Sequence, residues 1–283
     1  GRDMNIVYLI GMLLAVFFVG FGIVVDLGAD SWLNLDALKL FLDPASALIV
    51  LGGTFAVVVA CYPKQVRSIV SHFRIMLHTK TFDPEKYIDE LTELAQIARK
   101  NGLLALEERA NQQEDPFFKQ AIMLIVDATD PDRVRSILTN DIEQTSERHG
   151  EVIAMYERGS NAAPAFGMVG TLIGLIKMLF DLEAADMSSI GPNMGVALIT
   201  TFYGSLLAHV LFNPIAANLA ARDEEEVVCR EIILEGIMAI QSGENPKFLR
   251  ERLLTFMNQK QRDRGAGNGK KAKRGQGQND QAQ

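Results

Sequence analysis

Long apolar runs alternate with charged stretches along this chain of 283 residues. Four of the runs, at residues 6–25, 45–62, 162–180 and 193–212, are close to the roughly 20 residues that a helix needs to cross a bilayer core. Elsewhere the apolar positions recur at helical spacing, and no segment shows the alternation typical of a strand. The pattern predicts an all-α integral membrane protein with four transmembrane helices and two further helical regions.

Four Asp-Pro dipeptides predict helix starts, because Asp caps the first backbone amides and proline fits the first turn. They are Asp43-Pro44, Asp83-Pro84, Asp115-Pro116 and Asp130-Pro131. The helix after Asp83 is expected to end at Asn101-Gly102, with Ile88, Leu91, Leu94, Ala95 and Ala98 at core spacing. The helix after Asp130 can continue unbroken into the third apolar run. A break over 243–246 precedes a last helix that is expected to reach about Gln259.

The basic residues orient the four helices. Lys and Arg are frequent in residues 64–158 and 222–274, whereas only Lys39 lies between the first two runs and none lies between the last two. The positive-inside rule therefore places both termini in the cytoplasm. The resulting segments are a vector-derived remnant (1–3), transmembrane helices 1–2 with a periplasmic connection (4–62), a cytoplasmic helical domain (63–161), transmembrane helices 3–4 (162–213), C-terminal cytoplasmic helices (214–264) and a disordered basic tail (265–283).

Composition excludes several function classes. The net charge of −7 gives no support to nucleic-acid binding. The two cysteines, Cys61 and Cys229, are far apart, and both fall on the predicted cytoplasmic side, so a disulfide is not expected. No nucleotide-binding, metalloprotease or serine-hydrolase motif is present in a suitable context. We expect neither an enzyme with catalytic residues nor a permanently bound metal.

The last two apolar runs carry small residues three and four positions apart, which let helices approach closely in lipid. Pro164, in the first turns of the third run, is expected to free backbone carbonyls. Together with the hydroxyls of Thr171, Thr200 and Thr201, such carbonyls suit a small cation. The alternative interpretation is a tightly packed helix pair without an ion path.

No carboxylate lies within any of the four runs, although ion pathways in membranes usually need one. Lys177 and His209 are the ionisable residues there, and both are interpreted as structural. If ions cross the membrane here, another polypeptide must supply the acid.

Six segments of the chain resemble the MotA/PomA stator subunits of the bacterial flagellar motor, within the MotA/TolQ/ExbB superfamily. They occur in the order and spacing of that family, from Met4 to about Gln259. The segments are residues 43–54 (DPASALIVLGGT), 98–107 (ARKNGLLALE), 167–174 (GMVGTLIG), 197–204 (ALITTFYG), 212–216 (FNPIA) and 239–246 (AIQSGENP).

The resemblance implies a protein of the bacterial inner membrane, forming a ring of five copies around two copies of a single-span MotB/PomB-type partner that carries the membrane aspartate. It implies no cofactor, only transported Na⁺ or H⁺, and a cytoplasmic domain that pushes the rotor protein FliG.

The same resemblance implies roles for individual residues. It implies that Arg99, Lys100 and Glu107 contact the rotor. It also implies that Pro164 and Pro214 couple ion flow to the cytoplasmic domain. The ion path facing the partner is lined by Thr171, Thr200, Thr201 and Pro164. Thr200 precedes Thr201 in a pair that is typical of sodium-using members, so the sequence favours sodium over protons.

Two other functions stay open from the sequence. A TolQ/ExbB-like energiser of outer-membrane processes shares the small-residue helices, but its three spans leave the apolar hairpin of residues 6–62 unexplained. A helical membrane scaffold without ion conduction is the second.

Overall fold

The computed structural model describes residues 2–25, 33–67, 69, 82–183 and 187–257. These residues are mostly helical, with turns, short irregular connections and one isolated bridge between Val25 and Leu33. The elements are α1 (Arg2–Val24), α2 (Ala37–Leu40), α3 (Pro44–Ala47), the π-helix η1 (Leu48–Gly52), α4 (Gly53–Cys61), α5 (Pro63–Val66), α7 (Pro84–Asn101), the 3₁₀ turn η2 (Leu103–Leu106), α8 (Glu107–Gln112), α9 (Pro116–Val126), α10 (Pro131–Glu183), α11 (Ile190–Leu206), the π-helix η3 (Leu207–Phe212), α12 (Asn213–Gln241), α13 (Pro246–Leu253) and η4 (Leu254–Phe256).

Three helical stretches among the described residues are long and apolar enough to cross a membrane: Pro44–Cys61, Pro131–Glu183 and Ile190–Gln241. The apolar part of α1, Ile10–Val24, is shorter. The all-helical class is therefore confirmed, and the count of four spans stays a prediction. The predicted basic tail, residues 265–283, lies outside the described residues.

The chain forms two compact units, one of residues 1–81 and 148–222 and one of residues 82–147 and 223–283. Helices α10 and α12 each contribute residues to both units. We call these the first and the second unit. The segment boundaries predicted from the sequence describe membrane position, and they stay predictions.

The predicted helix starts are confirmed by their caps. The carboxylate of Asp43 accepts a hydrogen bond from the Ser46 amide at 2.7 Å. Asp115 accepts from the amides of Phe117 and Phe118 at 3.0 and 3.3 Å. The end of α7 is confirmed as well, because Gly102 follows it with φ +82°, a conformation that favours glycine.

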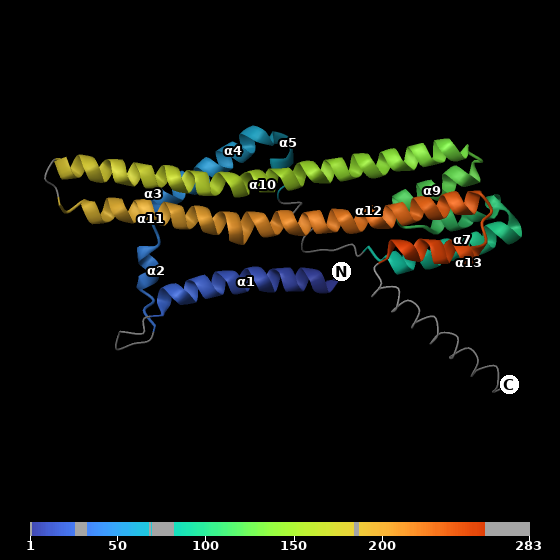
Figure 1. Ribbon diagram of the computed structural model, residues 1–283, viewed down its shortest axis with the longest axis horizontal. Coiled ribbons are helices and arrows are strands. Elements are labelled where there is room, and N and C mark those ends of the chain that lie inside the picture. The colour runs from blue at the N-terminus through green and yellow to red at the C-terminus, as the bar shows by residue number, and fades with distance from the viewer. Residues whose placement is uncertain (1, 26–32, 68, 70–81, 184–186, 258–283) are drawn as a thin grey trace, which may run out of the picture. The chain divides into compact units, whose positions relative to one another are not determined.

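Helices α7, α9 and α13 gather with the end of α12 in the second unit (Figure 1). Their apolar side chains form its core, and the fully buried ones include Ile88 and Leu91 of α7, Phe118 and Ile122 of α9, and Leu249 of α13. The helical spacing that predicts Ile88, Leu91, Leu94 and Ala95 as core positions is confirmed, and Ala98 packs against the core but is only partly buried. Glycine fits at position 236 of α12 because a Cβ there would lie 2.5 Å from the side chain of Leu91.

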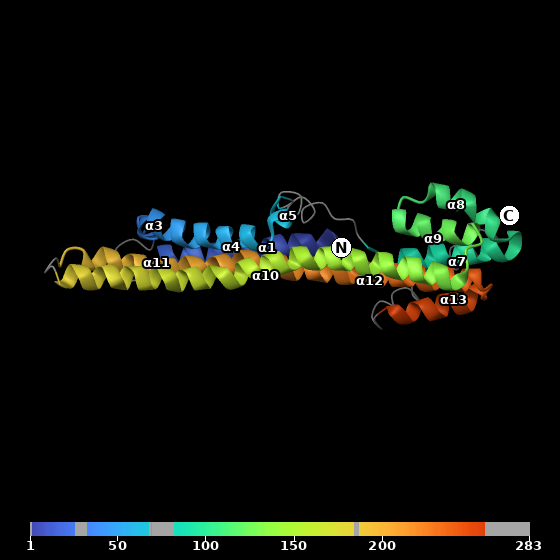
Figure 2. The ribbon, with the colours of Figure 1, turned by 90° about the horizontal axis from the view of Figure 1, so that it is seen from above.

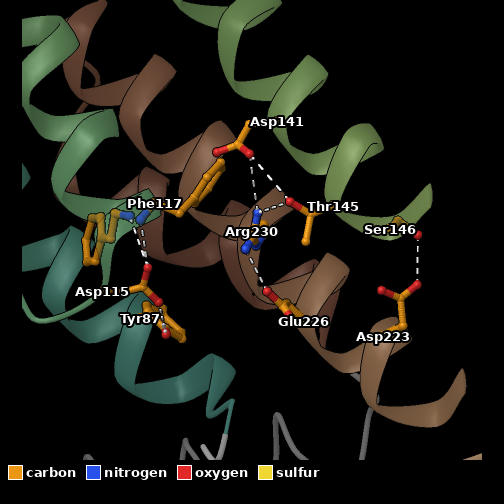
Figure 3. A network of polar contacts seen from close by, with 10 residues as sticks. Tyr87, Asp115, Phe117, Asp141, Thr145, Ser146, Asp223, Glu226 and Arg230 are labelled. Atoms are coloured by element: carbon orange, nitrogen blue, oxygen red, sulfur yellow. Dashed lines mark hydrogen bonds and ion pairs between the residues drawn. The ribbon is translucent and has the colours of Figure 1, made fainter. Parts of the chain in front are cut away.

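An ion-pair cluster around Arg230 lies beside this core (Figure 3). The guanidinium donates to Glu226 at 2.7 Å and to the Thr145 hydroxyl at 3.2 Å, and lies 3.9 Å from the Asp141 carboxylate. It also stacks over the ring of Phe117, with 4.9 Å from Cζ to the ring centroid. Arg230 thus connects α9, α10 and α12 within the second unit, because one planar cation satisfies a carboxylate, a hydroxyl and a ring at once.

Cys229, the neighbour of Arg230, is buried, whereas Cys61 is exposed. Burial raises the pKa of the Cys229 thiol to about 12, and the thiolate is the form that reacts with electrophiles. We expect a maleimide at neutral pH to label Cys61 in the native protein and to leave Cys229 unmodified. In denaturant both thiols should react. Labelling of Cys229 at the rate of Cys61 in the native protein would contradict this packing, and peptide mass spectrometry distinguishes the two sites.

Candidate functional site

Helices α10 and α11 lie side by side within the first unit, as Figure 2 shows from a second direction, and they touch through small residues. A Cβ added to Gly167 would lie 3.0 Å from the carbonyl oxygen of Thr200, and one added to Gly174 would lie 2.6 Å from that of Asn193. Gly170 faces the side chain of Thr200 in the same way, with 2.3 Å from the added Cβ to Cγ2. The close approach predicted from the small-residue spacing is confirmed.

Two of the three predicted threonines form a hydroxyl pair at the edge of this contact. The hydroxyls of Thr171 and Thr201 are 2.7 Å apart, and that of Thr171 also lies 3.0 Å from the carbonyl oxygen of Ala197. Thr201 is exposed and Thr171 partly so. Two neighbouring hydroxyls and a carbonyl offer neutral oxygen ligands of the kind that hard cations prefer.

The third threonine, Thr200, faces the other way. Its side chain is fully buried, and its hydroxyl lies 2.9 Å from the carbonyl oxygen of Val196 and 3.1 Å from that of Ala197 in its own helix. Within this chain Thr200 therefore packs against Gly170, and its hydroxyl proton is already donated to a backbone carbonyl of its own helix.

Pro164 is the third residue of the third apolar run and lies inside α10, which begins at Pro131. The predicted continuation of the helix after Asp130 into this run is confirmed. Proline has no amide proton, so the carbonyl of Ser160 loses its usual helical donor. Gly204 of α11 permits close contact here, because a Cβ at 204 would lie 2.6 Å from the carbonyl oxygen of Ala163.

Pro214 is the second residue of α12, which follows the π-helix η3 directly. Asn213, just before it, receives a hydrogen bond of 2.6 Å from the hydroxyl of Ser160 in α10. The sequence reasoning missed Ser160 and Asn213. The only signal for Asn213 is its place next to Pro214 in the FNPIA segment.

The second predicted span also packs on this pair. The Ser46 hydroxyl lies 3.4 Å from the carbonyl oxygen of Val196, and the Tyr203 hydroxyl accepts from the Asp43 amide at 3.3 Å. Gly53 faces the ring of Phe166, with 2.3 Å from an added Cβ to Cδ1. Helices α3, η1 and α4 thus pack against one face of the α10–α11 pair.

The predicted rotor-contact residues belong to the second unit. Arg99 and Lys100 lie in the last turn of α7, Glu107 begins α8, and the short turn η2 lies between the two helices. All three side chains are exposed, and none forms an ion pair within the described part of the chain. Their charges are therefore available to a partner. The described residues contain no group of acidic, His and Cys side chains arranged for a metal.

The contact at Gly204 gives a stability prediction. Gly204→Ala places a methyl group against backbone atoms of α10, and overpacking of this kind costs about 1–3 kcal/mol. Gly195→Ala is the matched control, because nothing lies within 4 Å of its added Cβ. We expect thermal unfolding in detergent to shift down by several degrees for Gly204→Ala only. Equal melting temperatures for the two variants would count against the contact.

Comparisons with known proteins agree with this geometry. The profile of the MotA/TolQ/ExbB proton channel family matches residues 109–232. Motility protein A of Borreliella burgdorferi is 38% identical over 226 residues, covering 80% of this chain and 86% of that protein. The chemotaxis protein PomA of Vibrio alginolyticus is 38% identical over 227 residues, covering 80% and 88%. A chain of the flagellar MotAB stator complex from Bacillus subtilis superposes with a TM-score of 0.80 at 29% identity, covering 90% of this chain and 97% of that one. The chain therefore belongs to the MotA/TolQ/ExbB proton channel family, in its MotA/PomA branch.

Proposed function

We propose that this chain is an ion-conducting stator subunit of the bacterial flagellar motor. The observation that carries the proposal is the 38% identity to a motility protein A and to PomA over four fifths of the chain. The first unit supports it, because it combines long apolar helices with a hydroxyl pair at the edge of a tight helix contact.

The absence of a carboxylate from the predicted spans supports a MotB/PomB-type partner that carries the membrane aspartate. The solved relative from Bacillus subtilis is itself a MotAB complex. We propose five copies of this chain around the partner in the inner membrane, with four spans and both termini in the cytoplasm.

Ion binding at the partner's aspartate neutralises a charge that is costly to hold away from water. The Thr171–Thr201 pair lines the route to that aspartate and offers oxygen ligands to a dehydrated ion, which favours Na⁺ over H⁺. Thr200 contributes indirectly, because its packing against Gly170 fixes how far Thr201 stands from α10. Neutralisation then permits the next step of rotation.

Pro164 removes a helical hydrogen bond inside α10, and Pro214 removes one where η3 continues into α12, which supports their role in coupling ion passage to the cytoplasmic domain. The exposed charges of Arg99, Lys100 and Glu107 engage FliG. These side chains carry both positive and negative charges and form no ion pair within the described residues. They can therefore contact a surface of complementary charge at low desolvation cost.

The ion is tested by expressing the chain with a MotB/PomB-type partner in a strain that lacks stators, and by measuring swimming speed against Na⁺ at fixed pH. We expect speed to rise with Na⁺. Thr201→Val, which removes one oxygen ligand, should raise the Na⁺ needed for half-maximal speed about tenfold. Thr201→Ser keeps the oxygen and should change little.

Other outcomes separate the remaining functions. Speed that follows pH and ignores Na⁺ would indicate a proton-driven subunit. No swimming, with rescue of an outer-membrane energisation defect, would indicate the TolQ/ExbB-like function. If no partner that carries an aspartate gives ion-dependent rotation or flux, the result would support the scaffold without ion conduction.

The rotor contact predicts a charge-specific loss of torque. Arg99→Glu or Glu107→Lys should weaken engagement about two- to fivefold, since one exposed pair contributes up to about 1 kcal/mol. Membrane abundance and ion dependence should stay unchanged. Arg133→Glu is the matched control, because Arg133 is also exposed in the second unit. Torque is measured on tethered cells, and a reversed charge on FliG should restore part of it. Normal torque in both variants would exclude the contact.

A further inference from the structure

One face of α11 and η3 changes character along the predicted fourth span. Over residues 193–200 its exposed side chains are apolar, namely Met194 and Leu198, which are 51% and 64% exposed. Over residues 201–213 every exposed side chain is polar. These side chains recur four positions apart and all belong to the first unit, and we call them the polar row: Thr201, Ser205, His209 and Asn213.

The other faces of this helical segment are covered within the chain. Towards α10, Gly204 and Ala208 are buried, and the Ser160 hydroxyl lies 3.4 Å from the carbonyl oxygen of Ala208. Towards α3, the Tyr203 hydroxyl accepts from the Asp43 amide at 3.3 Å. The polar row lies on the face that the described residues leave exposed. Its neighbour in the membrane is therefore lipid, water or another polypeptide.

The π-helix η3 keeps the row on one face. Four residues exceed one α-helical turn of about 3.6 residues by about 40°, so a regular α-helix would turn successive members of the row away from Thr201. A π-helix bonds residue i to residue i+5 and has more residues per turn, and η3 covers Leu207–Phe212. Because the wider turn opposes the drift, His209 and Asn213 stay exposed in line with Ser205.

A row of this kind does not suit a face towards lipid. Polar side chains at membrane depth are costly against hydrocarbon, and they usually face the bundle interior or a water-filled cavity. The row begins at the Thr171–Thr201 pair and extends over twelve residues, or about 18 Å, which is more than half of the roughly 30 Å hydrocarbon core. It therefore connects the hydroxyl pair to the predicted cytoplasmic end of the span.

The row can also hold water along its length. The Ser205 hydroxyl has no hydrogen-bond partner within the described residues, and the His209 ring contacts only Asn213, through Nδ1 at 3.2 Å. A hydroxyl and a neutral imidazole can each donate and accept. Successive members lie about 6 Å apart along the helix axis. One water molecule bridges such a gap with two hydrogen bonds of about 2.8 Å.

We propose that the polar row is the hydrated exit route of the transported ion, leading from the Thr171–Thr201 pair to the cytoplasm between this face and the partner's span. Met194 and Leu198 keep the same face dry on the outer side of the pair, so water enters the row from the cytoplasm. The inference rests on the proposed stator function and adds Ser205, His209 and Asn213 to the ion path. Bridging waters carry Na⁺ or H⁺, so the route does not depend on which ion is used.

Hydration of the row is measured by thiol labelling of the full chain, expressed with its MotB/PomB-type partner. The exposed Cys61 is replaced by Ala, and the buried Cys229 is kept. Ser205→Cys places a thiol in the row, and Leu198→Cys, two turns further out on the same face, is the matched control. A charged methanethiosulfonate reacts with the thiolate, which forms in water and not in a dry environment. In inside-out membrane vesicles we expect Ser205→Cys to react at least about tenfold faster than Leu198→Cys.

Rotation at varied Na⁺ separates ion exit from ion binding. Ser205→Val removes a group that hydrates the route after the ion has left its ligands. It should lower the maximal speed per stator unit about two- to fivefold, as expected for one lost hydrogen bond, without raising the Na⁺ needed for half-maximal speed. Ser205→Thr keeps a hydroxyl and should recover most of the speed lost in Ser205→Val. A merely structural role would lower the amount of complex in the membrane and leave the speed per stator unit unchanged.

The outcomes distinguish this inference from the proposed function, because labelling does not require rotation. Wild-type cells that rotate with neither Na⁺ nor H⁺ would refute the stator function, and labelling would still decide whether the row is hydrated. Equal labelling rates for Ser205→Cys and Leu198→Cys would overturn the exit route. So would disulfide-linked pairs of Ser205→Cys chains under mild oxidation, which would place the row between two copies of the chain. If Ser205→Cys does not assemble, His209→Cys repeats the test one turn further in, with the same expected difference.

Discussion

The contact between the backbones of α10 and α11 is the constraint on which the first unit depends. In lipid, apolar side chains gain nothing by leaving the solvent, so helices associate through close packing and polar contacts. Glycines 167, 174 and 204 leave no space for a Cβ where they meet the facing carbonyl oxygens. A larger residue at any of them separates the helices and breaks the Thr171–Thr201 pair, whose hydroxyls are 2.7 Å apart. The packing and the proposed ion path are therefore one feature.

The same contact is compatible with the proposed ion path although the chain carries no acid there. Its predicted spans supply neutral dipoles, which are inexpensive to bury when they bond one another. A carboxylate held there without a partner would be costly in every copy of the chain. An aspartate on the proposed partner limits that cost to the assembled complex. Conduction by the proposed complex would then require assembly, so an unassembled subunit would not leak ions.

Local chemistry made part of this structure predictable from the sequence. Each Asp-Pro pair acts within four residues, and the spacing of Ile88, Leu91 and Leu94 reflects a single helix, so caps and core positions follow directly. Tertiary contacts decide the rest. Thr200 and Thr201 are adjacent in sequence, yet the first packs against Gly170 and the second is exposed. The partners of Arg230 lie as far as 113 positions away, counting back to Phe117, and no local pattern indicates them. Hydropathy marks only residues 162–180 of α10, and the start of α10 at Pro131 follows from the Asp-Pro pair instead.

Irregular helix geometry is concentrated in one of the two units. Within the described residues, both π-helices and the internal Pro164 belong to the first unit, whereas the second unit combines capped regular helices with a closed apolar core and the Arg230 cluster. A π-helix or an internal proline leaves backbone groups without their usual bonds and lowers the cost of local rearrangement. A packed core does the opposite, because any shift in it creates cavities or overlaps. The proposed function needs both properties, since ion binding must change the backbone where the ion passes and the rotor contact must bear load without deforming. The distribution of prolines, π-helices and core residues along the chain meets these two requirements in separate units.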